Sequence, residues 1–344
     1  MKRHPTLSEH PYRPGLHRYC VLVAVCTFLL VIAGGMVTST DSGLAVPDWP
    51  LSYGQLMPPM VGGIFYEHGH RMVATFVGIL TVVLAFWVWR VEHRRWVRFL
   101  GIAALFAVVA QGVLGGLTVL YLLPLWISVS HATLAQSFFS LTIFLAVVTS
   151  RTWLSTTPVV VEESHRIRRF GAITVAAVFV QLILGALMRH TDSGMAVPDF
   201  PLAYGQLWPS LDPGSLAAIN DHRAGLNLLP VEGIQVALHL LHRLWGLVVM
   251  TFIVVLARAV FRIGRREGLL RETALLLTAL VLFQVLLGVL TVWTGKNPSV
   301  ATAHVAIGSL ILGCSVMLAS LSVRVLAARD ESHVGQLVPG RGSL

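Results

Sequence analysis

Eight long apolar runs restrict what this sequence can fold into. Each is about 20 residues long, which is the length an α-helix needs to cross a hydrocarbon layer roughly 30 Å thick. The runs cover about 19–38, 68–89, 99–120, 128–150, 169–188, 236–258, 272–293 and 301–324. Only 12% of the residues are charged, about half the share found in soluble domains. These features predict an all-α integral membrane protein and exclude a water-soluble enzyme, a nucleic-acid-binding domain and a disordered chain.

The positions of lysine and arginine predict how the chain is oriented in the membrane. Most of the 25 basic residues lie in the two tails and in the connections near 90–98, 151–169 and 258–271. Short cytoplasmic loops carry such an excess. We therefore expect a multi-pass protein of the cell (inner) membrane with both termini in the cytoplasm. The loops at about 39–67 and 189–235 then lie outside.

Two loop segments of the sequence are nearly identical. TDSGLAVPDWPLSYGQLMP begins at Thr40, and TDSGMAVPDFPLAYGQLWP begins at Thr191; they differ at four positions. Self-similarity of this kind indicates duplication. We expect two tandem four-helix bundles related by a parallel internal repeat. The halves are 19–150 and 169–324, joined by a cytoplasmic linker at 151–168 and followed by a disordered cytoplasmic tail at 325–344. The repeated aspartates Asp41, Asp48, Asp192 and Asp199 are interpreted as turn residues.

Four histidines are predicted at one depth near the outer face: His70, His131, His242 and His304. Each lies just inside one of the four apolar runs that pass from outside to inside, and His70 and His131 match His242 and His304 in the repeat. Ionisable groups within a membrane usually mark a functional site. Two histidines on facing helices can hold a haem iron from both axial sides. Zinc or copper is the less favoured metal, and pairing within or across the halves is left open.

Charged neighbours of these histidines suggest further roles. Arg71 and Arg243 follow His70 and His242; they either extend towards the membrane interface or bind a haem propionate. Glu67 lies one helical turn before His70, where the second half has His239 instead. A carboxylate beside a reacting macrocycle can accept a proton or stabilise a developing cation. The alternative is an acidic residue favoured by the helix dipole.

The chain resembles the heme A synthase family, membrane enzymes that oxidise haem O to haem A for cytochrome oxidase. The resemblance covers all eight apolar runs, and its most specific segments are GGMVTSTDSGLAVPDWPL, EHGHR, SHATLAQ, LHLLHR and TAHVAIG. It implies that His70 and His131 flank the haem O substrate, with Glu67 as the catalytic carboxylate. It also implies that His242 and His304 ligate a haem b that relays electrons. Some bacterial members have a cysteine pair in the first outer loop, whereas this loop has none.

The resemblance implies oxidation of a ring methyl group to a formyl group through a hydroxylated intermediate. The expected partners are the haem O substrate, an unidentified electron donor and the lipid bilayer, with no nucleic acid. The farnesyltransferase that makes haem O and cytochrome oxidase assembly factors are further candidate partners. Two other functions are weighed against this one. The first is a two-haem b-type electron-transfer cytochrome, in which Glu67 is dispensable. The second is a transporter with histidine proton relays, which binds no haem.

Overall fold

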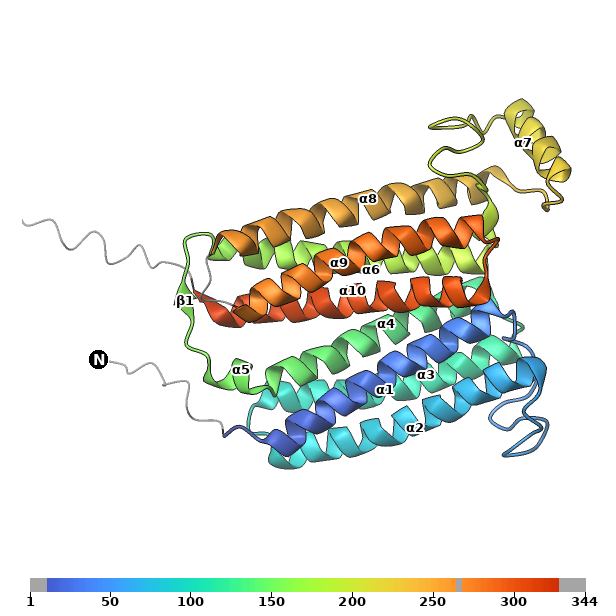
Figure 1. Cartoon of the computed structure of the whole chain (residues 1–344). Helices are drawn as coiled ribbons and strands as arrows, with labels where there is room; N and C mark the ends of the chain where they lie inside the picture. The colour runs from blue at the N-terminus through green and yellow to red at the C-terminus, as the bar shows by residue number, and fades with distance from the viewer. Residues whose placement is uncertain (1–10, 264–267, 328–344) are drawn as a thin grey trace, which may run out of the picture.

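Eight long helices run along the described part of the chain. They lie side by side and give the molecule two ends, one with the long loops and α7 and the other with α5 and β1 (Figure 1). The computed structural model describes residues 11–263 and 268–327. All eight helices are long and apolar enough to cross a membrane. They are α1 (Pro14–Ser39), α2 (Gly62–Val91), α3 (Arg95–Leu120), α4 (Leu125–Val148), α6 (Ser164–His190), α8 (Gly233–Arg262), α9 (Gly268–Trp293) and α10 (Pro298–Val325). The prediction of an all-α multi-pass membrane protein is confirmed.

The helices extend beyond the apolar runs because polar residues continue them into the membrane interface. Helix α1 begins with Pro14 and α10 with Pro298, at positions where the missing N–H costs no hydrogen bond. The Asn297 side chain accepts hydrogen bonds from two backbone N–H groups at the start of α10. Such a cap satisfies donors that a helix leaves free at its N-terminus.

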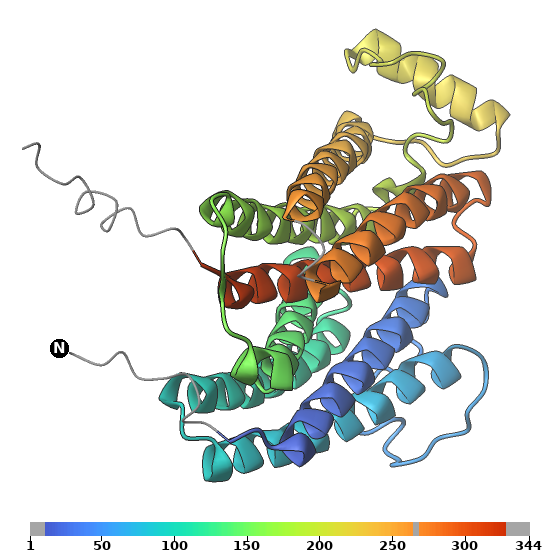
Figure 2. The same ribbon diagram turned by 60° about the vertical axis from the view of Figure 1, so that its left-hand side comes forward.

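The helices pack as two rings of four. In the first ring α2 and α4 both pack on α1 and α3, and in the second α8 and α10 both pack on α6 and α9. Helices α2 and α4 therefore lie at opposite corners of one ring, as α8 and α10 do in the other. The rings meet where α1 and α4 pack against α10 and where α4 packs against α6 (Figure 2). Each ring has a hydrophobic core of its own.

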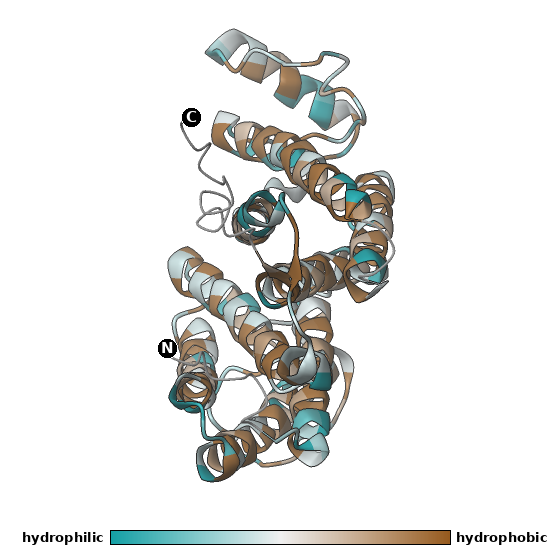
Figure 3. Cartoon of the chain, turned by 90° about the vertical axis from the view of Figure 1, so that its left-hand side faces the viewer, coloured by the Kyte–Doolittle hydropathy of each residue, from teal (hydrophilic) through white to brown (hydrophobic). Residues whose placement is uncertain are grey.

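Hydrophobic residues occur along most of the length of the helices (Figure 3), and many of the large ones are exposed on the outside of the bundle. Phe76, Phe86, Phe99 and Phe106 are each more than half exposed. In water such a surface would favour association, whereas lipid tails accept it.

Several short elements lie outside the eight helices and were not predicted. The predicted linker contains the short helix α5 (Arg151–Ser155) and the strand β1 (Val159–Val160), which pairs in parallel with β2 (Leu326–Ala327). Beyond residue 327 the predicted disordered tail falls outside the described residues. The second outer loop contains the 3-10 turn η1 (Ser193–Met195) and the helix α7 (Pro213–Gly225). Its counterpart in the first loop is a shorter connection without such a helix. The parallel repeat and the two-domain division remain predictions.

Candidate functional site

A glycine on the preceding helix packs against each of the four predicted histidines. A methyl group built on Gly115 would lie 3.1 Å from Cε1 of His131, and one on Gly288 would lie 3.2 Å from Cε1 of His304. Gly34 and Gly185 hold the same position against His70 and His242. The imidazole rings therefore rest on bare helix backbone, where a larger side chain would push them away.

Glutamines hold three of these four histidines by their backbone. The side-chain amides of Gln111, Gln181 and Gln284 donate to the carbonyl oxygens of His131, His242 and His304, at 2.9, 3.1 and 2.9 Å. Each glutamine lies one helical turn before the packing glycine. Sequence analysis missed this group, although the repeat aligns Gln111 with Gln284. In the same alignment Gln181 is matched by Leu30, so the carbonyl of His70 has no such amide.

In the second ring, His242 and His304 face each other across the bundle. Their ring centres are 6.5 Å apart, and the ring planes are inclined at 57°. When two imidazoles bind one metal from opposite sides, each ring centre lies a metal–nitrogen bond of about 2 Å plus half the ring width from the metal. The two ring centres are then about 6 Å apart. The pair therefore has the spacing that an iron between the rings needs. It also lies within one half of the chain.

The ring nitrogens of these histidines differ in their surroundings. The Nε2 atoms of His131 and His304 lie 3.5 and 3.4 Å from the amide nitrogens of Gln111 and Gln284, and both ring nitrogens of His242 lie within 3.4 Å of that of Gln181. The Nδ1 atoms of His70, His131 and His304 are buried and have no hydrogen-bond partner among the described residues. A buried polar atom without a partner is costly. The described residues contain no group of three or more His, Cys, Asp or Glu side chains able to hold a metal. Two histidines leave the other positions around an iron to a macrocycle, so the His242–His304 pair fits haem better than a bare metal ion.

Arg71 ties the first outer loop to α2. Its Nη1 atom donates to the carbonyl oxygens of Asp48 and Leu51, and its Nη2 atom donates to that of Val46. Nη2 also forms a 2.6 Å ion pair with Oε1 of Glu67. A guanidinium has five N–H donors, and these contacts use four of them. Only the Nε–H of Arg71 is left for the predicted propionate contact, which remains a prediction.

Glu67 is buried and holds the same loop from the other side. Its Oε2 atom accepts a 2.8 Å hydrogen bond from the backbone N–H of Val46. Each carboxylate oxygen can accept two hydrogen bonds, so Oε1 and Oε2 keep capacity after these contacts. The Nδ1 atom of the neighbouring His68 lies 2.8 Å from the hydroxyl oxygen of Ser52. Glu67, His68 and Arg71 thus join the loop to the helix that carries His70.

The second outer loop has the same arginine contacts with a different neighbour. Arg243 donates to the carbonyl oxygens of Val197, Asp199 and Leu202. In place of the carboxylate, the Nδ1 atom of His239 lies 3.0 Å from the carbonyl oxygen of Ser193. Glu67 and His239, which occupy equivalent positions in the two halves, therefore attach the two outer loops in different ways.

The aspartates Asp48 and Asp199 act as turn residues, as predicted. Asp48 accepts from the backbone N–H groups of Tyr53 and Gly54, and Asp199 does so from Tyr204 and Gly205. In Asp48 these backbone hydrogen bonds lower the pKa of the carboxyl group. Asp41 and Asp192 also lie in turns, with left-handed φ values of 51° and 53°. Asp41 in addition forms an ion pair with Arg189 at the end of α6, so it joins the two halves.

A buried arginine attaches helix α7 to the rest of the second outer loop. Arg223 is 3% exposed and donates to the carbonyl oxygens of Met195 and Leu229 and to the hydroxyl of Tyr204. Ile219 of α7 packs with Val197 and Val231 in a separate small core. The second outer loop is therefore fixed more firmly than the first.

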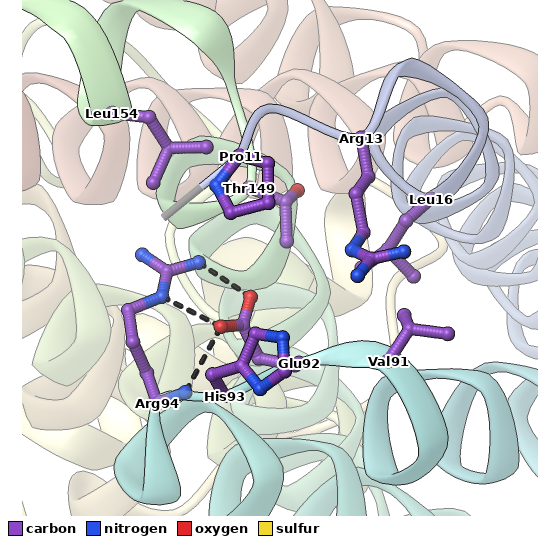
Figure 4. Close-up of a pocket in the computed structure, with 9 residues that line it drawn as sticks. All are labelled: Pro11, Arg13, Leu16, Val91, Glu92, His93, Arg94, Thr149 and Leu154. Carbon is purple, nitrogen blue, oxygen red and sulfur yellow. Dashed lines mark hydrogen bonds and ion pairs between the residues drawn. The ribbon is translucent and has the colours of Figure 1, made fainter. Parts of the chain in front are cut away.

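The opposite end of the first ring has a small pocket, lined by Pro11, Arg13, Leu16, Val91, Glu92, His93, Arg94, Thr149 and Leu154 (Figure 4). Its volume of about 10 Å³ is enough for one water molecule and too small for a substrate. Inside it, Glu92 forms a 2.7 Å ion pair with Arg94. Burial raises the pKa of Glu92, but the hydrogen bonds from Arg94 outweigh that effect and lower the pKa overall.

The ion pair between Glu92 and Arg94 is expected to stabilise the fold in a pH-dependent way. The lowered pKa means that the pair stabilises the fold above the unfolded pKa of about 4.3 and that this stabilisation is lost as pH falls through the folded value. Glu92→Gln is expected to lower the free energy of unfolding by about 2 kcal/mol at pH 7. Thermal unfolding in detergent at pH 7 and near pH 3 measures this. Glu162→Gln, at an exposed linker position, is the control. An equal effect of Glu92→Gln at both pH values would contradict the assignment.

The fold defines a multi-pass membrane protein, and in its second ring two buried histidines have the spacing that a haem iron needs. A family model described as cytochrome oxidase assembly protein (COX15-CtaA) matches residues 17–63 and 61–316. The chain belongs to this family.

Curated relatives over most of the chain are named heme A synthase. The protein of Alkalihalophilus pseudofirmus is 28% identical over 326 residues, which cover 92% of this chain and 98% of the relative. That of Chelativorans sp. is 30% identical and covers 86% and 87%. That of Novosphingobium aromaticivorans is 24% identical and covers 93% and 99%. The resemblance noted in the sequence is thereby confirmed.

Proposed function

We propose that this protein is a heme A synthase, which oxidises a methyl group of haem O to the formyl group of haem A through a hydroxylated intermediate. The reaction supplies haem A to cytochrome oxidase. The single observation that carries the proposal is the family membership, with relatives of that name matching along nearly their whole length. The paired buried histidines agree with it, because a haem-handling enzyme needs axial ligands within its helices.

The two rings are proposed to form two domains with different tasks. In the N-terminal domain, His70 and His131 hold the haem O substrate. In the C-terminal domain, His242 and His304 hold a haem b, which when bound supplies a redox-active iron that passes electrons to the first site. The 6.5 Å spacing of the His242 and His304 rings supports this assignment. An electron donor outside the chain completes the reaction.

Glu67 is proposed as the catalytic carboxylate. It lies one turn before His70, and its second-half counterpart is His239. Its contacts with Arg71 and Val46 fix the carboxylate in place without using all its acceptor capacity. A fixed carboxylate can accept a proton from the reacting group or stabilise positive charge that develops there. Arg71 and Arg243 keep the outer loops over the two sites, and any propionate contact is an added role.

The same proposal places the protein in the cell membrane with both termini in the cytoplasm. The excess of arginine near α5 and at the connections between α2 and α3 and between α8 and α9 supports this orientation. The four histidines then lie towards the outer face. The enzyme that makes haem O and assembly factors of cytochrome oxidase are the partners expected from the reaction.

Haem analysis of the purified protein tests the function directly. We expect protein made in cells that also make haem O to yield haem A or its hydroxylated intermediate, separated by chromatography and identified by mass. Haem B alone, with haem O available, would instead indicate a two-haem electron-transfer cytochrome. Absence of any haem would indicate the transporter.

A further inference from the structure

A single lysine lies at the outer end of the second ring. Lys296 is in the turn between α9 and α10, and its backbone N–H donates to the carbonyl oxygen of Thr291. Its side chain reaches across to the loop after α6, where a methyl group built on Gly194 would lie 3.3 Å from its Cδ atom. The neighbouring Ser193 contacts His239 of α8. Lys296 therefore spans the outer end of the ring that contains His242 and His304.

The other cations at this end are already engaged. Arg71 and Arg243 bind loop carbonyl oxygens, Arg189 pairs with Asp41, and Arg223 binds two carbonyl oxygens and a hydroxyl. The half-buried Lys296 has no ion-pair partner within residues 11–263 and 268–327. This lysine is therefore the outer cation best able to receive an added anion.

The corresponding position of the first ring carries no charge. The alignment that pairs His131 with His304 also pairs Leu123 with Lys296. The two residues share a left-handed backbone, with φ of 59° and 61°. They also share their packing, because a methyl group built on Gly43 would lie 3.4 Å from Leu123 Cδ1. At this position, therefore, the two rings share one backbone conformation, and only the second ring carries a cation.

We infer that Lys296 binds a propionate of the haem held by His242 and His304 and so retains that haem as a resident group. The inference rests on the proposed function of this site. A charge-assisted contact at the rim strengthens binding, which suits a haem that stays. Leu123 offers no such contact, which suits a site whose substrate enters and whose product leaves. Because Leu123 and Lys296 share their backbone conformation, exchanging one residue type for the other is a suitable test.

The test uses full-length protein loaded with haem B. Lys296→Leu is expected to release the low-spin haem about tenfold faster to excess apomyoglobin. It is also expected to lower the midpoint potential of that haem, because loss of a nearby cation favours the ferric form. Lys296→Arg keeps the charge and is expected to match the wild type in both measurements. Leu123→Lys is expected to slow release from the first ring.

The outcomes separate this inference from the proposed function. Wild-type protein that binds no haem would contradict the function itself. If the wild type binds haem but Lys296→Leu leaves both the release rate and the potential unchanged, the inference alone is wrong. If Lys296→Leu and Lys296→Arg change the release rate and the potential equally, the effect comes from the shape of the side chain and not from its charge. That result would also overturn the inference. Leucine already occupies the equivalent backbone position of the first ring, so Lys296→Leu is expected to fold. A low-spin haem spectrum recorded before apomyoglobin is added identifies the folded variants.

Discussion

The Glu67→Gln variant is expected to keep its bound haem and to lose haem A formation by a factor of a hundred or more, about the effect of removing a general acid–base group. Glutamine has nearly the shape of glutamate, and its carbonyl oxygen can still accept from Arg71 or from the N–H of Val46. It cannot carry the negative charge or take the proton. Haem extracted from the variant and the wild type, quantified by mass, measures the loss.

Two further variants separate catalysis from attachment of the loop. Arg71→Gln removes the ion pair and the three contacts to loop carbonyls while leaving the carboxylate. If Glu67 acts on the substrate, Arg71→Gln is expected to weaken haem binding and to retain more turnover per bound haem than Glu67→Gln. Asp221→Asn, at an exposed position on α7, is the control. Haem A formation at the normal rate in Glu67→Gln would disprove the catalytic assignment.

The second large effect is expected from His304→Ala, which removes one of the two facing rings of the C-terminal site. A haem iron left with one axial histidine loses its low-spin state, and the cavity left by the imidazole weakens its retention. We expect loss of the low-spin haem b absorbance and, with it, loss of haem A formation. Absorbance spectroscopy of the reduced protein and total haem content measure both.

The matched control is His222→Ala, at an exposed position on α7. It removes an imidazole outside the helix rings and is expected to leave the spectrum unchanged. Full low-spin absorbance in His304→Ala would show that His304 is not a ligand. Loss of the haem in His222→Ala as well would point to general instability rather than to ligation.

Hydrophobicity made the eight helices predictable, because crossing a membrane requires about 20 apolar residues and satisfied backbone hydrogen bonds. Helix ends were less predictable, since they depend on caps such as Asn297 and on polar residues outside the apolar run. Helix α7 was missed because it is short and has only two large apolar side chains, Leu216 and Ile219. It is stabilised by the buried Arg223 and by a few apolar contacts made across the loop, and no local periodicity marks such contacts.

The candidate site was predicted in part. The repeat identified the four histidines, and their depth follows from topology alone. Their pairing could not be read from the sequence, because it depends on which helices lie at opposite corners of a ring. Loop contacts of Arg71 and Arg243 were missed because their acceptors are backbone carbonyl oxygens, which look the same at every residue. The difference between Gln181 and Leu30 could have been predicted, because the repeat aligns these two positions.

The contact between the two rings sets the geometry of electron transfer in the proposed reaction. Helices α4 and α10, which carry His131 and His304, meet directly. Phe139 of α4 is buried there, and a methyl group built on Gly313 of α10 would lie 3.2 Å from its ring. Beside this contact lies an apolar cavity of about 410 Å³, whose lining includes Phe28, Phe139 and Met317. In the proposed reaction electrons would cross the boundary between the rings, so the packing of α4 on α10 would set the separation of the two sites.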